Sequence, residues 1–435
     1  MRPTDLADPA WLTDTVREHH RELGLPVAPV TVDLLDACVK NPHLPDSPRC
    51  RGWATLRVPT MAEGGDPLFL LRSVGDAAAP SGTPVTGLPL RAWRFPDDPG
   101  LPLLATMVEP ERVRALLPER LAGHTVEEVR VVRWQPGISA TLRCGLTGPG
   151  GRTAVYAKLF APGDHGPGEL VAVEARQRLL HADAPQGLSV AEPLGLDTQR
   201  RVLWTREVVG RSLVRDADGA TMSTRSAEVV GAALAALHTS GLSTSPVRPI
   251  RTVSPEEVAT EARKKTRKIA SARPEHARSV RRLAALASAL TAKPRVQGTL
   301  HGDFHLDQVL LTDEGPVLLD LDEMATGDPA LDLAEIAVDV GLRRLPRATS
   351  VPFLDALGQS YVEAGGTPPP PAVLRGYAAA ELLNRCYRRL RRPVPGWEQG
   401  LEHDLAAAHV VLTGAALTAP RTSRSKTRTM TGART

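Results

Sequence analysis

The residues whose types and spacing could carry chemistry lie close together, in the segment 300–334. Asp303, Gln308 and Asp320 stand there among strongly apolar neighbours. Residues 309–311 and 316–321 are apolar runs separated by Asp-Glu-Gly, a pattern that predicts two strands joined by a tight turn. Such a hairpin brings two or three carboxylates and one amide to its open end. Oxygen ligands of this kind suit Mg²⁺.

The same segment resembles the catalytic region of a known family. His-Gly-Asp at 301–303, Gln308 five residues later and Leu-Leu-Asp at 318–320 resemble the aminoglycoside phosphotransferases and related small-molecule kinases. Gly-Asp-Pro-Ala-Leu-Asp-Leu-Ala at 327–334 is typical of that family. The resemblance extends over about residues 125–420. It implies an α+β, bilobal protein-kinase-like fold with a β-rich N-lobe and a mainly helical C-lobe, preceded here by an N-terminal extension domain.

The resemblance also assigns roles to three polar residues. Asp303 would orient the acceptor hydroxyl and take its proton, although a carboxylate in a turn can also be a simple cap. Asp320 would hold Mg²⁺. Gln308 would offer its amide oxygen to the metal in place of the family's usual Asn, or it would only bond the loop backbone.

The nucleotide phosphates need a cation, and Lys158 is the best candidate. Residues 153–160 read as a strand, whose period of two places Tyr156, Lys158 and Phe160 on one face. A lysine on a strand is more often solvated. Here a predicted helix over 168–182 follows and carries Glu174, at a spacing that resembles the lysine–glutamate ion pair of kinases.

Two further segments are candidates for nucleotide contact. Gly137 and Ser139 lie in the turn 136–139, where the phosphate-covering loop of the family falls, although a plain hairpin turn explains them equally well. Glu207 and Val209 fall where the hinge would pair with adenine through backbone groups, which any side chain permits.

Several nearby residues have less specific interpretations. The resemblance makes His301 a brace of the loop and Asp332 a residue that steadies it, while Asp328 is explained as a helix cap. His305 either approaches the phosphates or metal or merely packs. Asp322 is either a supporting neighbour of the metal ligands or a residue at the lip of the site near the substrate. An arginine cluster is read as a solvated helix face rather than a binding surface: Arg385, Arg388, Arg389, Arg391 and Arg392.

The chain divides into four predicted parts. They are an N-terminal extension of unknown role over 1–93, for which a cap is one candidate, an N-lobe with a lead-in helix over 94–208, a helical C-lobe over 209–420 and a disordered basic tail over 421–435. Residues 8–23 and 109–121 read as helices, and 80–89 as a linker. Within 125–207 the order strand–strand–strand–helix–strand–strand is predicted, and after Gly210 the pattern becomes helical.

Charge and composition narrow the class of protein. The formal charge of +4 over 435 residues comes from five basic residues after residue 420, so the body is nearly neutral and argues against nucleic acid as a partner. The four cysteines lack the spacing of a zinc site and suit free thiols in the cytoplasm. We expect no signal peptide and no membrane span, because no apolar run is long enough.

Together these features predict an enzyme that uses ATP and Mg²⁺ to phosphorylate a hydroxyl of a small molecule. The family suggests a sugar, aminosugar or aminoglycoside-like acceptor. An aminoglycoside would favour acidic lining, for which Asp307, Glu323 and Glu381 are candidates. The alternative is a non-catalytic kinase-fold protein that binds a nucleotide or metabolite and regulates a partner. A protein kinase is disfavoured because 323–330 is too short for an activation segment. The oligomeric state stays open.

Overall fold

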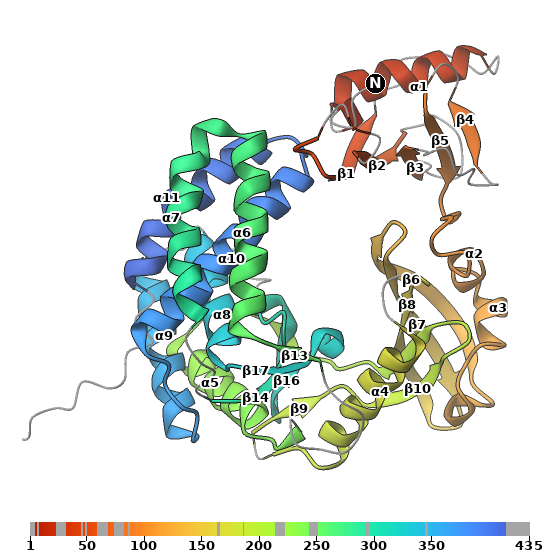
Figure 1. Cartoon of the computed structure of the whole chain (residues 1–435). Helices are drawn as coiled ribbons and strands as arrows, with labels where there is room; N and C mark the ends of the chain where they lie inside the picture. Colours follow the sequence, from red (N-terminus) through yellow and green to blue (C-terminus); the bar gives the residue numbers. More distant parts are fainter. Residues whose placement is uncertain are drawn as a thin grey trace, which may run out of the picture.

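The structure is a computed structural model of the 435-residue chain. It describes residues 5–6, 8–22, 32–44, 47, 50–58, 68–73, 82–85, 88–162, 166–185, 187–213, 222–242, 251–291, 296–343 and 347–414. The predicted tail over 421–435 lies outside these residues. Figure 1 shows three bodies, namely an N-terminal unit, a strand-rich lobe and a helical lobe. Among the described residues we find no helix that is both long and apolar enough to span a membrane.

The N-terminal unit is an antiparallel sheet with one helix. Its helix α1 (Pro9–Glu22) agrees with the prediction for 8–23. The sheet has the order β1-β2-β3-β5-β4, and its strands are β1 (Asp33–Lys40), β2 (Arg51–Arg57), β3 (Leu68–Ser73), β4 (Thr83–Val85) and β5 (Leu90–Arg94). Part of the predicted linker over 80–89 is thus a strand. Pro84 is tolerated there because β4 lies at the sheet edge, where its missing N–H is not needed by a second neighbour.

The lead-in segment to the N-lobe differs from its prediction. Instead of one helix over 109–121, it contains α2 (Leu104–Met107), α3 (Pro110–Arg114) and the 3₁₀ turn η2 (Glu119–Leu121). Pro118 has an extended backbone with ψ of 154°, and a proline also keeps the residue before it out of helical geometry. The helical pattern therefore breaks between α3 and η2.

The N-lobe is a second antiparallel sheet, of order β10-β11-β8-β7-β6, with one helix. The elements are β6 (Thr125–Gln135), β7 (Ser139–Gly148), β8 (Gly151–Phe160), α4 (Pro167–Ala182), β10 (Pro193–Asp197) and β11 (Val202–Arg206). This order is the predicted one. Burial alternates along β7, so that Leu142, Cys144 and Leu146 enter the core while their neighbours stay partly exposed.

The C-lobe is mainly helical and holds two small sheets. Its helices are α5 (Thr224–His238), α6 (Pro255–Ala272), α7 (Ala277–Ser288), α8 (Ala330–Leu342), α9 (Arg347–Glu363), α10 (Pro371–Arg391) and α11 (Trp397–Gly414). The first sheet pairs β12 (Arg211–Ser212), β15 (Val309–Thr312), β16 (Gly315–Leu318) and β9 (Ser189–Val190), and the second pairs β13 (Thr252–Val253), β17 (Ala325–Gly327) and β14 (Gly298–Leu300). The predicted hairpin is β15–β16.

Close helix packing in the C-lobe depends on Gly231. This residue lies inside α5, and a Cβ atom placed on it would come within 2.3 Å of the backbone oxygen of Leu357 in α9. A backbone atom cannot swing aside as a side-chain tip can, so only glycine allows this approach of the two helices.

We therefore expect Gly231→Ala to lower the free energy of unfolding by about 1–3 kcal/mol, in spite of the higher helix propensity of alanine. Chemical denaturation followed by circular dichroism measures this. Gly150→Ala is the matched control, because a Cβ at Gly150 meets nothing within 4 Å. Equal stability of the two variants would contradict the packing argument.

Candidate active site

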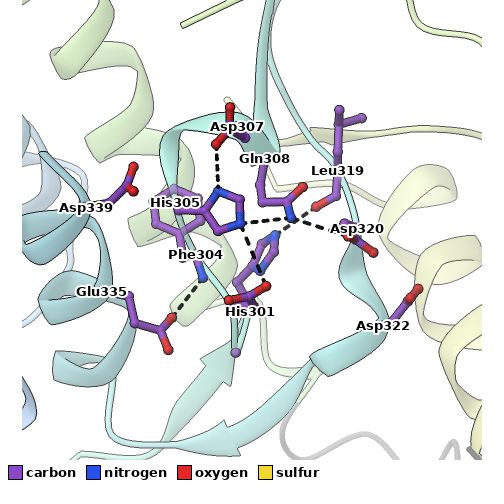
Figure 2. A network of polar contacts seen from close by, with 12 residues as sticks. His301, Phe304, His305, Asp307, Gln308, Leu319, Asp320, Asp322, Glu335 and Asp339 are labelled. Atoms are coloured by element: carbon purple, nitrogen blue, oxygen red, sulfur yellow. Dashed lines mark hydrogen bonds and ion pairs between the residues drawn. The ribbon is translucent and has the colours of Figure 1, made fainter. Parts of the chain in front are cut away.

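The loop that carries Asp303 is held by three carboxylates of one helix. Asp332, Glu335 and Asp339 lie on the same side of α8, three and four residues apart. Asp332 accepts hydrogen bonds from the backbone N–H groups of His301 at 2.7 Å and Gly302 at 3.0 Å. Glu335 accepts from Phe304 at 2.8 Å, and Asp339 from Leu306 at 3.2 Å, as Figure 2 shows in part. The loop is thereby fixed to the C-lobe over its whole length.

Only Asp332 was predicted to steady this loop. Glu335 and Asp339 were missed, although their regular spacing with Asp332 in an otherwise apolar helix was a readable signal. Buried carboxylates in such a helix need donors, and the nearest donors are loop N–H groups. The predicted cap is present as well, because Asp328 Oδ1 accepts from Ala330 N at 2.9 Å.

The pKa values of the carboxyl groups on α8 are shifted in opposite directions. Burial opposes ionisation of Asp332, but hydrogen bonds from His238 at 3.0 Å and from His301 hold its pKa below the usual range. Burial and the neighbouring Asp332 instead raise the pKa of Glu335 well above its usual range. Asp332 is thus an anion at neutral pH, and Glu335 is the weaker acid of the two.

Asp303 stands at the tip of this loop with its side chain 45% exposed, beside His305. His305 Nε2 lies 3.7 Å from Asp303 and His305 Nδ1 lies 3.5 Å from Asp307. Burial alone would lower the pKa of His305, but the two carboxylates raise it to about 9. Burial also works against the charge of Asp303, but His305 and Arg388 lower its pKa. Asp303 is therefore a carboxylate at neutral pH, as a proton acceptor must be.

His301 has the bracing role that the resemblance implies. Its ring is fully buried, and Nε2 lies 2.9 Å from the carbonyl oxygen of Leu319, between β16 and Asp320 (Figure 2). Burial lowers the pKa of His301, so the ring is neutral. It ties the loop that carries Asp303 to the end of the hairpin.

Lys158 reaches across from the N-lobe to two acids of the C-lobe. Its Nζ is hydrogen-bonded to Asp320 and to Asp322 and lies 5.3 Å from the centre of the Phe160 ring, on the strand face predicted from the sequence. Burial works against the charge of Lys158, but the two carboxylates raise its pKa. Asp320 adopts a left-handed backbone with φ of 57°, unusual for a residue other than glycine and typical of positions fixed by function.

The two acids share this cation unequally. Burial raises the pKa of both, but Lys158 lowers the pKa of Asp320 to about 2. The pKa of Asp322, whose side chain is only 8% exposed, is raised by burial and by the charge of Asp320 to about 6. Asp322 thus contacts the same ammonium group as Asp320, and both roles predicted for it stay open.

The ion pair expected between Lys158 and Glu174 is wrong for this structure. Glu174 pairs with Arg178, one turn further along α4, and among the residues that the structure describes Lys158 pairs with Asp320 and Asp322 instead. The spacing of sixteen residues was correct for a strand followed by a helix, but it could not show where along α4 the acid would face. An arginine four residues away satisfied Glu174 locally.

Gln308 lies at the mouth of the hairpin, 6% exposed. Its Nε2 is 3.3 Å from Asp320 Oδ2 and 3.3 Å from His305 Nε2, and its backbone oxygen accepts from Leu319 N at 2.9 Å (Figure 2). Among the described residues no group of three His, Cys, Asp or Glu forms a ready metal cage. Mg²⁺ commonly takes one or two protein oxygens and leaves its other positions to phosphate and water. Asp320 would supply a carboxylate oxygen. Gln308 would supply its amide oxygen after a half rotation that exchanges Oε1 and Nε2.

The turn around Gly137 has another use than the predicted one. Gly137 has φ of 67°, and its N–H donates to Asp98 Oδ2 at 2.8 Å, which also accepts from Trp134 Nε1 at 2.9 Å. A Cβ on Gly100 would lie 2.4 Å from Gly137 Cα, so the close backbone approach is between two segments of the chain. The geometry favours the plain-turn interpretation of Gly137. Ser139 Oγ donates to Gln135 at 3.2 Å and lines a cavity described next.

Two cavities meet at Lys158, Asp320 and Asp322. One, of about 730 Å³, lies on the side of the segment 207–210 that joins the lobes, and it is lined by Glu207, Val209 and Gln308 among others. Glu207 is bound to Arg143 at 2.6 and 2.9 Å, which lowers its pKa, while Val209 is 85% exposed. The second cavity, of about 490 Å³, lies on the side of Asp303. We call them the hinge cavity and the Asp303 cavity.

Two lobes, a hairpin with converging acids and a cation opposite them define a kinase-type site. A sequence profile of the phosphotransferase enzyme family (APH) matches residues 146–383, more than half of the chain. The chain belongs to this family, and the predicted α+β, bilobal protein-kinase-like fold with an N-terminal extension is confirmed. The coarse function, a small-molecule phosphotransferase of kinase type, follows from the family.

This chain matches solved structures of similar proteins over most of the length of those proteins. Macrolide 2′-phosphotransferase MphH from Brachybacterium faecium is 21% identical over 68% of this chain and 97% of that chain, with a TM-score of 0.44. A thermostable mutant of aminoglycoside phosphotransferase APH(4)-Ia is 15% identical over 68% and 97%, with a TM-score of 0.49. A choline/ethanolamine kinase family protein from Mesorhizobium loti is 18% identical over 71% and 99%, with a TM-score of 0.49. No curated protein sequence matches the chain.

The opposite pKa shifts on α8 give a matched pair of variants. Asp332→Asn replaces an anion that accepts two backbone hydrogen bonds and should cost about 3 kcal/mol of unfolding free energy. Glu335→Gln alters a group whose pKa is raised by burial, so less charge is lost, and it should cost under about 1 kcal/mol. Because the pKa of Asp332 is lowered in the folded state, its contribution is present at neutral pH and lost as the pH falls into the acid range. Denaturant titrations at several pH values measure both effects. Equal losses at neutral pH would refute the difference in charge.

Proposed function

We propose that this protein transfers the γ-phosphoryl group of ATP to a hydroxyl of a small, sugar-like molecule. The observation that carries the proposal is the meeting of the two cavities at Lys158, Asp320 and Asp322, with Asp303 facing one cavity and the lobe connection facing the other. Phosphoryl transfer needs little covalent work from a protein. It needs two oxygens held in line and compensation of charge on the moving group.

Each residue of the site has a defined task in this reaction. The acceptor oxygen forms a bond to the γ-phosphorus as the bond to the bridging oxygen breaks and ADP leaves with its electron pair. Asp303 orients the hydroxyl and takes its proton, for which its lowered pKa suits it. Lys158 faces the phosphates, and Asp320 with Gln308 would hold Mg²⁺. When bound, Mg²⁺ neutralises phosphate charge.

The segment 207–210 is proposed to contact the adenine ring through its backbone. It borders the hinge cavity together with apolar side chains of both lobes, namely Val190, Leu203, Leu310 and Leu318. Apolar surfaces above and below a planar base, with backbone groups at its edge, are a common way to bind such a ligand.

The N-terminal unit is proposed to cover the acceptor end of the site. Cys38 and Trp53 line the Asp303 cavity. Arg391 Nη2 lies 3.4 Å from Cys38 Sγ, and Arg392 pairs with Asp36 at 3.6 Å. This arrangement supports the predicted role of the extension as a cap.

The catalytic assignment is tested by two substitutions. Asp303→Asn and Asp320→Ala should each lower kcat by on the order of 10³ or more while the fold survives. Phosphate incorporation into a panel of sugar-like acceptors is measured with ATP and Mg²⁺, and chelation of the metal should abolish it. Asp313→Asn is the control, because Asp313 lies exposed in the turn of the same hairpin. Near-normal turnover in either site variant would remove the mechanism. A wild type that binds ATP without turnover would favour the non-catalytic alternative.

The cap assignment is tested by a matched pair of tryptophans. Trp53 and Trp93 are both buried in one apolar cluster of the N-terminal sheet, but only Trp53 lines the cavity. Trp53→Phe should raise the KM of the best acceptor about tenfold, equivalent to ~1.4 kcal/mol, and leave the Kd of ATP within about twofold. Trp93→Phe should change stability alone. Equal acceptor KM values for the two variants would show that the extension does not contact the acceptor.

A further inference from the structure

The Asp303 cavity has an unbalanced charge. It is lined by six basic side chains, Arg133, Lys158, Lys265, Arg388, Arg391 and Arg392, and by four acidic ones, Asp303, Asp320, Asp322 and Glu323. The acids are largely engaged already, since Lys158 bonds Asp320 and Asp322, and Arg251 lies 3.8 Å from Glu323. The remaining positive charge belongs to the end of the cavity that α6 and α10 form, and no residue of these two helices lines the hinge cavity.

Three basic side chains at that end have no carboxylate within ion-pair distance among the described residues: Lys265, Arg388 and Arg391. Lys265 bonds the neutral amide of Asn384, and burial and the neighbouring Arg388 lower its pKa while acids further away oppose the shift. Arg391 contacts Cys38, and its Nε is buried without a hydrogen-bond partner. Lys265 and Arg391 are half-buried, whereas Arg388 is exposed. Half-buried cations without an anion are costly, and a bound anion would offset that cost.

The arginine cluster of α10 therefore has two different faces. Away from the cavity, Arg385 pairs with Glu381 at 2.6 Å and with Asp339 at 3.6 Å, and Arg389 pairs with Asp404 at 3.0 Å. Arg388 and Arg391 point to the cavity instead. Arg388 is exposed, in keeping with the solvated-face interpretation, but it also lines the cavity together with half-buried Arg391. Helical spacing separates arginines that pair within the C-lobe from arginines that line the cavity.

Asp307, Glu323 and Glu381 were the candidates for the acidic lining of an aminoglycoside site, but they do not together line the Asp303 cavity. Glu381 is bound by Arg385 and Asn384, and Asp307 lines the hinge cavity beside Arg343. Glu323 alone lines the Asp303 cavity, near Arg251. A polycationic molecule would meet cations at the distal end of this cavity.

We propose that the acceptor is a hydroxylated anion, bearing a carboxylate or phosphate group that Arg388, Arg391 and Lys265 bind while its hydroxyl faces Asp303. The inference rests on the proposed phosphotransferase function and names the acceptor class of that same site. Planar guanidinium groups bind both kinds of oxyanion in a bidentate manner, and the aromatic rings of Trp53 and Tyr387, which line the same cavity, offer surfaces for the carbon skeleton. None of the three cations lines the hinge cavity. The proposed anion site is therefore distinct from the proposed nucleotide site.

Matched acceptors test the inference on the full-length protein. Glucose, glucuronate, glucose 6-phosphate and glucosamine share one ring but differ in charge. Phosphate transfer from ATP should show kcat/KM values for at least one of the two anions that exceed the glucose value by on the order of tenfold or more, with glucosamine the poorest. The two anions separate a carboxylate from a phosphate preference. Equal or better turnover of glucose or glucosamine would overturn the inference and leave the phosphotransferase proposal intact.

Variants locate the effect on α10. Arg388→Gln should raise the KM of the preferred anion by on the order of tenfold and leave the KM of glucose and of ATP within about twofold. Arg375→Gln is the control, because it removes the same charge from an exposed position about 20 Å away along the same helix. If Arg388→Gln instead weakens ATP binding, this arginine serves the nucleotide, and the inference fails.

A binding measurement covers the case in which none of the four sugars is phosphorylated. Calorimetry with glucuronate and glucose 6-phosphate, in the presence of a saturating non-hydrolysable ATP analogue, reports anion binding outside the nucleotide site. Binding that Arg388→Gln abolishes and Arg375→Gln preserves would support the anion site although catalysis had failed. Absence of binding to both anions would overturn the anion site.

Discussion

The contact of the Lys158 ammonium with Asp320 and Asp322 is the interaction on which the arrangement of the site depends. It joins a strand of one lobe to the end of a hairpin in the other, and it forms the boundary between the two cavities. Two acids side by side in a half-buried place need a cation, because otherwise one of them must take up a proton. The pKa of Asp322 is raised chiefly by burial and further by the charge of Asp320, and the Lys158 ammonium opposes both effects.

The loop around Asp303 is positioned by a different device. Carboxyl groups of α8 hold its backbone N–H groups, and His301 fixes it to the hairpin, so that Asp303 and Asp320 belong to one block of the C-lobe. Backbone N–H groups in a buried loop must find acceptors, and a helix alongside supplies them at regular intervals. Stability of the loop and placement of the Asp303 carboxyl group thus have a common origin.

Much of the fold could be predicted from the sequence, and the reasons are local. The apolar runs around the Asp-Glu-Gly turn and the alternation in 153–160 depend on neighbours in the chain, and the structure agrees with both. The partner of Glu174 and the division of the α10 arginines depend on which face of a helix meets which distant element, and sequence periodicity leaves that undetermined. The role of Gly137 depends on its hydrogen bond to Asp98. Asp98 lies in the preceding segment and belongs to no recognisable motif.

The packing of Trp134 against the N-terminal sheet has a mechanical consequence. Asp98 braces the β6–β7 turn through Trp134 and Gly137 within the N-lobe, and Trp134 also packs against the N-terminal cluster of Cys38, Trp53, Leu70 and Trp93. In the part of the chain that the structure describes, the extension also contacts the C-lobe through Arg391, Arg392 and Val394. The extension therefore bridges the two lobes beside the Asp303 cavity, so a rotation of the N-lobe about the segment 207–210 would have to break one of these two sets of contacts.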